Sequence, residues 1–280
     1  MRIFITGDKG QLGQALYAAL SEHTLAGCDL PEVDITDRVA IDRTIADFGP
    51  DVVIHAAAWT DVDGCARDQE RAYHVNALGT QYVALACRSC DASLVYISTN
   101  EVFDGTASQP YREWDPPHPA NPYGRSKAGG EWFARHLLTR FYIVRTAWLY
   151  APGGRNFSNP RRIVQLADEL GALRVVTDEI SNPTYAPDLA SALAALVNTH
   201  AYGIYHLTNA GYCSRYEFVR QVLRTSERAH VPVEPITLAD FPRTSTPPHF
   251  APLANTAAEA LGIRLRSWEE ALEAFLHSAA

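Results

Sequence analysis

The chain has 280 residues, of which 47% are hydrophobic and 20% are charged, as in ordinary globular proteins. Its net charge of −8 disfavours binding to nucleic acids or to membrane surfaces. No apolar run approaches the ~18 residues that a membrane span needs. The N-terminus enters a strand pattern at once, which is not typical of a signal peptide. We therefore expect a soluble, cytoplasmic protein.

In chain order, strand-like and helical segments alternate through the first half. Strands are predicted at residues 2–7, 24–29, 51–57, 93–99 and 141–147, and helices at residues 11–22, 37–49, 70–90 and 126–138. This alternation is typical of βαβ units with right-handed crossovers. The expected fold class is α/β, with a Rossmann-type doubly wound parallel sheet and a smaller C-terminal α/β lobe.

Three glycines with the spacing G-x-x-G-x-x-G lie between the first strand and the first helix. Glycine permits a tight turn there and lets the backbone approach a pyrophosphate, which the helix N-terminus then stabilises. In this position the pattern indicates a dinucleotide-binding loop more than a simple βα turn. The loop residues expected to bind the cofactor are Gly7, Lys9, Gly10, Gln11, Leu12 and Gly13.

Asp29 follows the second strand, 22 residues after Gly7, where an acid binds the adenine ribose. Such an acid favours NADH, whereas the Lys9 ammonium would attract the extra phosphate of NADPH, so both cofactors stay open. Asp34 and Ile35, in the next loop, are expected to contact the adenine. Asp34 is equally explained as a negative charge near the start of the next helix.

After about Leu149 the alternation loosens. Residues 150–160 form a Gly/Pro-rich loop, residues 203–209 a further strand, residues 241–255 a Pro-rich turn region and residues 267–278 an amphipathic helix. We therefore expect an NAD(P)-binding Rossmann domain at residues 1–149, which also receives the strand near 203–209. Residues 150–280 are expected to form mainly a substrate-binding lobe.

The cysteines do not indicate a functional site. There are five, an odd number that favours reduced thiols in a chain of this length. Cys87 and Cys90 form a C-x-x-C motif at the end of a helical pattern, whereas a redox motif opens a helix. No second cysteine pair completes a zinc site, and no metal is expected.

Tyr123 and Lys127 have the spacing Y-x-x-x-K, which places both on one face of a helix. An ammonium beside a phenol is expected to lower the phenol pKa towards neutrality, as suits a proton donor to a developing alkoxide. The preceding strand ends at Thr99, whose hydroxyl can hydrogen-bond the same substrate oxygen. This order of elements predicts a reductase-like site.

The chain resembles the dTDP-4-dehydrorhamnose reductase family of extended short-chain dehydrogenases/reductases over nearly its whole length. The motifs that carry the resemblance include GDKGQLG, VNALGT, STNEVFDG, NPYGRSKAGGE, RTAWLYAPGGRNF and NPTYAPDLA. It implies that Thr99, Tyr123 and Lys127 are catalytic. It further implies a cofactor-lining set (Ala56, Ala57, Ala58, Tyr123 and Lys127) and a substrate-binding set (Thr99, Asn100, Glu101, Trp148 and Asn156). Trp148 is alternatively a core aromatic between the lobes.

The implied reaction is hydride transfer from NADPH or NADH to the C4 keto group of a deoxysugar nucleotide. The substrate that the resemblance favours is dTDP-4-dehydro-L-rhamnose, which gives dTDP-L-rhamnose. The only other partner expected is a second copy of the chain, in a homodimer.

The motif STNEVFDG departs from the family pattern S-T-D-Y-V-F-D-G. Related 4,6-dehydratases carry T-D-E, in which the Asp is the acid for water loss and the Glu is the base at C5. Glu101 matches the dehydratases, but Asn100 cannot titrate. The simplest interpretation of Glu101 is a solvated loop acid.

Two further departures concern the substrate and the dimer. Pro247-Pro248 lie where reductases tend to carry Arg-Pro, with the Arg near the diphosphate. Arg243 or Arg155 is a candidate for the missing charge. Ala15 lies where some members have a glutamate that binds magnesium at a dimer contact, so a metal-bridged dimer is not expected.

Two rival functions remain. One is an epimerase or dehydratase that retains and regenerates its NAD. The other is a non-catalytic NAD(P)-binding subunit, because the regulatory subunit of methionine adenosyltransferase is similar to this family. The intact Thr99, Tyr123 and Lys127 set speaks against the second, although a fold alone does not settle function.

Overall fold

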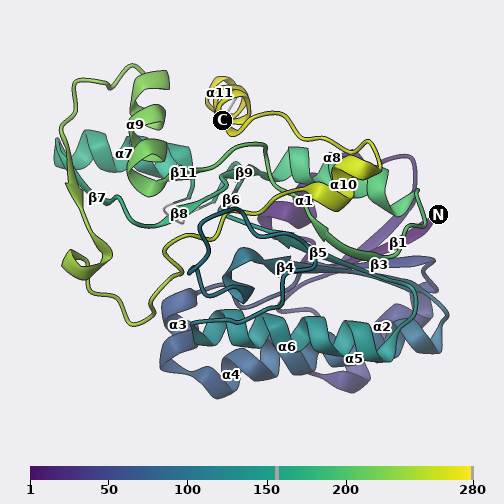
Figure 1. Cartoon of the computed structure of the whole chain (residues 1–280). Coiled ribbons are helices and arrows are strands. Elements are labelled where there is room, and N and C mark those ends of the chain that lie inside the picture. Colours follow the sequence, from purple (N-terminus) through teal and green to yellow (C-terminus); the bar gives the residue numbers. More distant parts are fainter. Residues whose placement is uncertain (155–157, 279–280) are drawn as a thin grey trace.

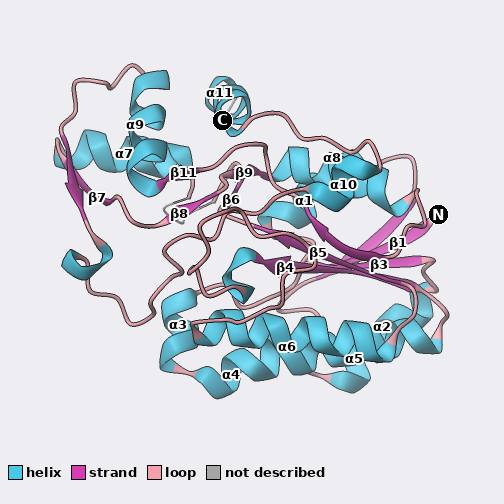
Figure 2. Ribbon diagram, viewed as in Figure 1, coloured by secondary structure: helices cyan, strands magenta, loops and turns pink. Residues whose placement is uncertain are grey.

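The computed structural model describes residues 1–154 and 158–278 and is built around a six-stranded parallel sheet (Figure 1). Its strands lie in the order β10-β5-β4-β3-β1-β2. They are β1 (Arg2–Thr6), β2 (Thr24–Cys28), β3 (Val52–His55), β4 (Ser93–Thr99), β5 (Phe141–Thr146) and β10 (Gly203–His206). Helices cover both faces of the sheet, as Figure 2 shows, and the expected Rossmann-type fold class is confirmed.

The two faces of the sheet bury different side chains. Alternate residues of a strand point to opposite faces, so Ile3 and Ile5 join one apolar cluster and Phe4 joins the other. The first face is covered by α1 (Gln11–Ala19), α8 (Ala186–Val197) and α10 (Thr256–Ala260). The second is covered by α2 (Arg38–Phe48), α5 (Gly79–Ser89) and α6 (Pro122–Leu137).

Local capping signals explain the helix that was predicted at residues 37–49. The Asp37 carboxylate accepts hydrogen bonds from the backbone N–H groups of Val39 and Ala40, both at 3.0 Å. The helix ends at Gly49, whose φ of 61° is readily adopted by glycine. The predicted bounds are therefore confirmed within one residue.

The continuous helix predicted at residues 70–90 is wrong in its middle. The chain forms α4 (Gln69–Tyr73), a π-helical turn at His74–Leu78 and then α5, and a short α3 (Val62–Arg67) precedes them. The π-helical turn holds the buried Asn76, whose amide donates to Ser126 Oγ at 2.9 Å on α6. Apolar periodicity does not reveal such a turn, which is frequent near functional sites.

Within its described residues, the smaller lobe carries three α-helices around an aromatic core. They are α7 (Pro160–Leu170), α9 (Arg215–Thr225) and α11 (Trp268–His277), the last at the position predicted for an amphipathic helix. Short strand pairs join them: β7 (Leu173–Val176) with β12 (Val233–Ile236), β8 (Ile180–Ser181) with β11 (Cys213–Ser214), and β6 (Leu149–Tyr150) with β9 (Thr184–Tyr185). Tyr150, Phe218 and Phe275 are fully buried between them.

Segments beyond residue 149 return to the large sheet. β10 pairs with β5 in parallel, with Tyr205 opposite Val144, so the strand predicted near residues 203–209 is present. α8 and α10 also pack on this sheet. The division of the chain at residue 149 stays a prediction.

Two expectations concern features outside the sheet. All five cysteines are free, and Cys87 and Cys90 lie at the end of α5, as the sequence indicates. Within residues 1–154 and 158–278, no helix has the length and apolar character that crossing a membrane requires.

Replacement of Gly13 by alanine tests the glycine-rich loop. The added Cβ would lie 2.4 Å from the carbonyl oxygen of Gly7 and 2.5 Å from the Asp8 backbone. We expect a loss of about 1–3 kcal/mol of unfolding free energy, measured by chemical denaturation, together with weaker NADPH binding. Ala18→Ser, on the exposed side of the same helix, is the matched control. Wild-type stability and NADPH affinity in Gly13→Ala would contradict the close packing.

Candidate active site

The glycine-rich loop packs directly against the loop that follows β3. Gly7 has a φ of 71°, and a Cβ there would lie 2.7 Å from the backbone nitrogen of Ala57. Gly10 is the N-cap of α1, so the free N–H groups of that helix point into the loop. Gln11, in its first turn, has a side-chain oxygen that is buried without a partner among the described residues. This cradle fits a pyrophosphate, and a side chain on Gly7 would collide with the Ala57 backbone beside it.

The corner where the sequence predicts ribose binding brings Asp29 and Lys9 together. The Asp29 carboxylate accepts hydrogen bonds from the backbone of Lys9 at 3.2 Å and of Leu30 at 2.8 Å. Lys9 Nζ lies 2.6 Å from Glu32 Oε1 in an exposed ion pair. One cation and two carboxylates therefore meet at this corner. The carboxylate expected to favour NADH and the ammonium expected to favour NADPH are both present.

The residues expected around the adenine occupy different environments. Asp34 is exposed, and its carboxylate accepts hydrogen bonds from Thr36 N and Oγ1 at 2.8 and 2.7 Å. It does not cap α2, a role that Asp37 fills. Ile35 is buried against Gly79, and Ala56, Ala57 and Ala58 are partly exposed after β3.

The three residues predicted to be catalytic lie together at the carboxyl end of β4. Thr99 ends this strand, and its hydroxyl lies close enough to Tyr123 to lower the pKa of the phenol. Tyr123 lies in the first turn of α6, and Lys127 follows one turn later. Asn121 caps this helix by accepting a hydrogen bond from Gly124 N at 2.8 Å. A Cβ on Gly124 would lie 2.0 Å from the Glu101 carbonyl oxygen, so glycine lets α6 begin close to the loop after β4.

The expected lowering of the Tyr123 pKa by Lys127 is wrong. Burial and the nearby Glu101 carboxylate raise the pKa of Tyr123, while the Thr99 hydrogen bond opposes this effect. The phenol is therefore protonated and carries the proton that a donor must deliver. Burial lowers the pKa of Lys127 to about 7, and the Glu131 carboxylate raises it in opposition. Lys127 Nζ lies over the Tyr96 ring, 4.3 Å from its centroid.

A small pocket lies beside this trio, between the two lobes. Its lining residues are Asn100, Glu101, Trp148, Glu179, Ile180, Ser181, Pro247 and Pro248. The free volume is about 10 Å³, roughly the space of one water molecule. The pocket is therefore lined by three of the predicted substrate-binding residues, and Thr99 directly precedes one of them, Asn100, in the chain.

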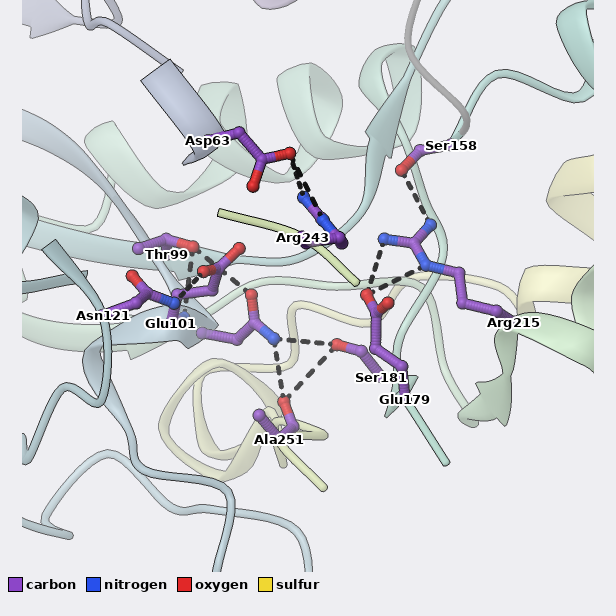
Figure 3. A network of polar contacts seen from close by, with 11 residues as sticks. Asp63, Thr99, Glu101, Asn121, Ser158, Glu179, Ser181, Arg215, Arg243 and Ala251 are labelled. Carbon is purple, nitrogen blue, oxygen red and sulfur yellow. Dashed lines mark hydrogen bonds and ion pairs between the residues drawn. The ribbon is translucent and has the colours of Figure 1, made fainter. Parts of the chain in front are cut away.

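The interpretation of Glu101 as a solvated loop acid is only partly right, because the residue is half-buried and its carboxylate is hydrogen-bonded. Figure 3 shows its carboxylate pointing towards Asn121, whose amide donates to Glu101 Oε2 at 2.6 Å. Burial, and then the Glu179 carboxylate, raise the pKa of Glu101 to about 7, although the Asn121 hydrogen bond opposes them. This carboxyl group therefore changes its charge near neutral pH.

Asn100 connects the loop after β4 to the smaller lobe. Its amide donates to Ser181 Oγ at 3.0 Å and to the Ala251 carbonyl oxygen at 3.2 Å, and its own oxygen accepts from Thr99 Oγ1 at 3.3 Å. An amide at this position is a neutral donor and acceptor, and it cannot supply a proton for water loss.

Trp148 combines the two roles that the sequence left open. Its backbone has a φ of 40°, and its ring packs on the smaller lobe while also lining the pocket. The Arg215 guanidinium lies 3.5 Å from the ring centroid. It donates to Glu179 Oε1 at 2.9 and 3.0 Å and to Ser158 Oγ at 3.0 Å. Sequence reasoning missed Arg215 and Glu179, because no motif or period joins residues 36 positions apart.

The Pro-rich segment at residues 241–250 reaches across the pocket. Pro247 and Pro248 line it, and Asp63 of α3 accepts hydrogen bonds from Arg243 Nη2 at 3.3 Å and from Ser245 N at 2.9 Å. The candidate charge of Arg243 is therefore close to the site but paired with Asp63. Arg155 and Asn156 lie outside the described residues.

A dinucleotide cradle, a protonated tyrosine and a lysine at the edge of a parallel sheet define an NAD(P)H-dependent oxidoreductase of the Rossmann class. The family model "RmlD substrate binding domain" matches residues 1–280. The chain therefore belongs to this family, and the resemblance inferred from the sequence is confirmed.

Relatives that match nearly the whole chain support this family assignment. The spore coat polysaccharide biosynthesis protein SpsK of Bacillus subtilis is 36% identical over 98% of this chain and 96% of its own. The dTDP-4-dehydrorhamnose reductase of Mycobacterium tuberculosis is 37% identical over 97% and 91%. The NADP complex of the dTDP-4-dehydrorhamnose reductase of Bacillus anthracis has a TM-score of 0.94 at 36% identity and covers 98% of each chain.

Replacement of Glu101 by glutamine tests the environment of this carboxyl group. Because the folded pKa of about 7 lies above the unfolded value, folding favours the protonated acid, and stability is lost as pH rises between the two values. At pH 8, Glu101→Gln should therefore be more stable than wild type by on the order of 2–3 kcal/mol. Below pH 4 this difference should disappear. Chemical denaturation across this pH range, with Glu70→Gln as an exposed control, measures it. A difference that does not depend on pH would contradict the burial.

Proposed function

We propose that the protein reduces the C4 keto group of a deoxysugar nucleotide with NADPH or NADH. The substrate that we favour is dTDP-4-dehydro-L-rhamnose, which is reduced to dTDP-L-rhamnose. The observation that carries the proposal is the meeting of Thr99, Tyr123 and Lys127 beside a pocket that Trp148 and Glu101 line. Relatives named dTDP-4-dehydrorhamnose reductase support the choice of sugar nucleotide.

Each residue has a distinct role in this reaction. Thr99 Oγ1 donates a hydrogen bond to the C4 carbonyl oxygen, and Tyr123 gives its proton to that oxygen as an alkoxide develops. Lys127 would hold the ribose next to the nicotinamide and would supply positive charge near the reacting oxygen. When bound, the nicotinamide supplies the hydride. The pyrophosphate would lie on the N–H groups at the start of α1, with Asp29 on the ribose.

The pocket residues would orient the sugar. Trp148 offers one face of its ring, because Arg215 covers the other, and Glu101 can accept a hydrogen bond from a sugar hydroxyl. The free volume of about 10 Å³ is far below that of a sugar ring. Substrate binding therefore requires displacement of the segment at residues 241–250, whose contacts with Asp63 are partly exposed.

Asn100 makes the reductase the better choice over a dehydratase, since the chain lacks the acid that water loss needs. An epimerase that retains and regenerates its NAD would show no net consumption of NADPH or NADH. The predicted homodimer, the cytoplasmic location and a substrate contact by Asn156 stay predictions.

The substitution Tyr123→Phe tests the proposal. It removes the proton donor but keeps the ring, so turnover should fall by at least about 100-fold while NADPH binding is retained. The assay follows NADPH and NADH absorbance with dTDP-4-keto-L-rhamnose, and fluorescence titration measures cofactor binding.

Tyr202→Phe, at an exposed position just before the amino end of β10 and so opposite to the carboxyl ends that carry the site, is the control and should keep wild-type rates. Full activity of Tyr123→Phe would exclude the mechanism. Purification of the wild type with tightly held NAD, and no net oxidation of NADPH, would favour the epimerase or dehydratase. Neither turnover nor retained NAD would favour a binding subunit.

A further inference from the structure

A buried charged network lies directly behind the proposed catalytic trio. Arg145 of β5 is fully buried, and it binds Glu131 of α6 in a two-pronged ion pair. Arg145 Nε donates to Glu131 Oε1 at 2.9 Å, and Nη2 donates to Oε2 at 2.7 Å. Ser98 Oγ also donates to Glu131 Oε1, at 2.6 Å. The side chains of this ion pair are 0% and 3% exposed, so water does not weaken these contacts.

Glu131 therefore joins the two elements that carry the proposed catalytic residues. Ser98 immediately precedes Thr99 on β4, and Glu131 lies one turn beyond Lys127 on α6. Residues four positions apart lie on one face of a helix. The hydrogen bond between Ser98 and Glu131 fixes the end of β4 against the turn of α6 that holds Lys127.

The guanidinium nitrogen of Arg145 that does not contact Glu131 is held in place as well. Its Nη1 lies 3.4 Å from the carbonyl oxygen of Glu113 and 3.4 Å from His206 Nε2. His206 Nδ1 faces two carbonyl oxygens at 3.1 Å and therefore carries the hydrogen, which leaves Nε2 to accept from Arg145. Burial and then Arg145 lower the pKa of His206 to about 3, so this ring adds no second positive charge.

Stability alone does not account for this arrangement. Buried ion pairs can often be replaced by apolar residues of similar volume with no loss of stability, because desolvation offsets their attraction. An Arg–carboxylate pair with two parallel hydrogen bonds does fix position, since both the distance and the plane are set. Its carboxylate lies one helical turn from Lys127 and opposes the desolvation of that ammonium, and Cys65 of α3 acts in the same direction to a smaller extent.

We propose that Ser98, Glu131 and Arg145 form a positioning network that holds the Lys127 ammonium charged and aligned with Thr99 for ketone reduction. Neither Glu131 nor Arg145 would touch the substrate. The kinetic part of this inference rests on the proposed function, whereas the effect on the charge of Lys127 does not.

The composition of the chain allows a direct measurement. Lys9 and Lys127 are the only lysines, so protein labelled with ¹³C at the lysine ε carbon gives two NMR signals, and Lys9→Arg assigns them. The Lys127 signal should titrate near pH 7. The exposed Lys9 is an internal reference, because the hydrogen bond to Glu32 raises its pKa above the usual range of a lysine.

The test variant is Glu131→Leu with Arg145→Met, which removes the pair without leaving a buried charge unpaired. We expect its Lys127 midpoint to fall by about one pH unit or more. The fall of kcat at high pH should shift equally, and kcat should drop by about 100-fold with little change in KM. Ser98→Ala keeps the charge, so it should leave the Lys127 midpoint unchanged and lower kcat by about 10-fold.

The control is Asp168→Leu with Arg228→Met, which removes a two-pronged ion pair on the surface of the smaller lobe. It should change neither the Lys127 midpoint nor kcat. A folded Glu131→Leu/Arg145→Met variant with the wild-type midpoint and pH profile would overturn the inference, as would unchanged kcat in Ser98→Ala. Failure of the wild type to reduce the ketone would instead refute the proposed function, and the NMR titration would still decide whether the network sets the charge of Lys127.

Discussion

The removal of the Lys127 ammonium from water is the constraint on which much of this structure depends. An ammonium in an apolar site loses its charge unless nearby groups compensate for the lost hydration. Here the face of the Tyr96 ring lies 4.3 Å from Nζ, and the Glu131 carboxylate follows one helical turn later. The Tyr96 hydroxyl also donates to the Lys127 carbonyl oxygen at 3.1 Å, which fixes this turn of α6 on β4. The same contacts therefore hold the helix on the sheet and the charge in the site.

The start of α6 is a second constraint, and the sequence N-P-Y-G at residues 121–124 satisfies it. Asn121 uses both ends of its amide: the oxygen caps α6 at Gly124, and the nitrogen donates to Glu101. Proline at the first helical position needs no N–H partner. Glycine at position 124 allows the helix to begin against the Glu101 carbonyl oxygen. One short segment thus fixes the position of Tyr123 and the orientation of the pocket acid.

The sequence predicted those features that depend on neighbours along the chain. The glycine-rich loop, the Asp37 cap and the strand–helix alternation are local patterns, and they led to the correct sheet and to the predicted catalytic trio. The contacts that complete the site join distant positions. Arg215 and Glu179 are 36 residues apart, and Arg243 and Asp63 are 180 apart. No periodicity connects such pairs, and their burial follows only from the way the lobes close.

The charges in the pocket explain why the motif STNEVFDG combines features of the reductases and of the dehydratases. Among its described lining residues, Glu179 is paired with Arg215, whereas Glu101 faces the neutral Asn121 amide. Burial, and then the Glu179 carboxylate, raise the pKa of Glu101 to about 7, so its proton affects the charge of the pocket near neutral pH. Dehydration requires a base together with an acid that expels hydroxide, and Asn100 offers only an amide bonded to Ser181 and Ala251. Proton removal by Glu101 would therefore not lead to water loss, which supports the proposed reduction of the carbonyl by way of Tyr123.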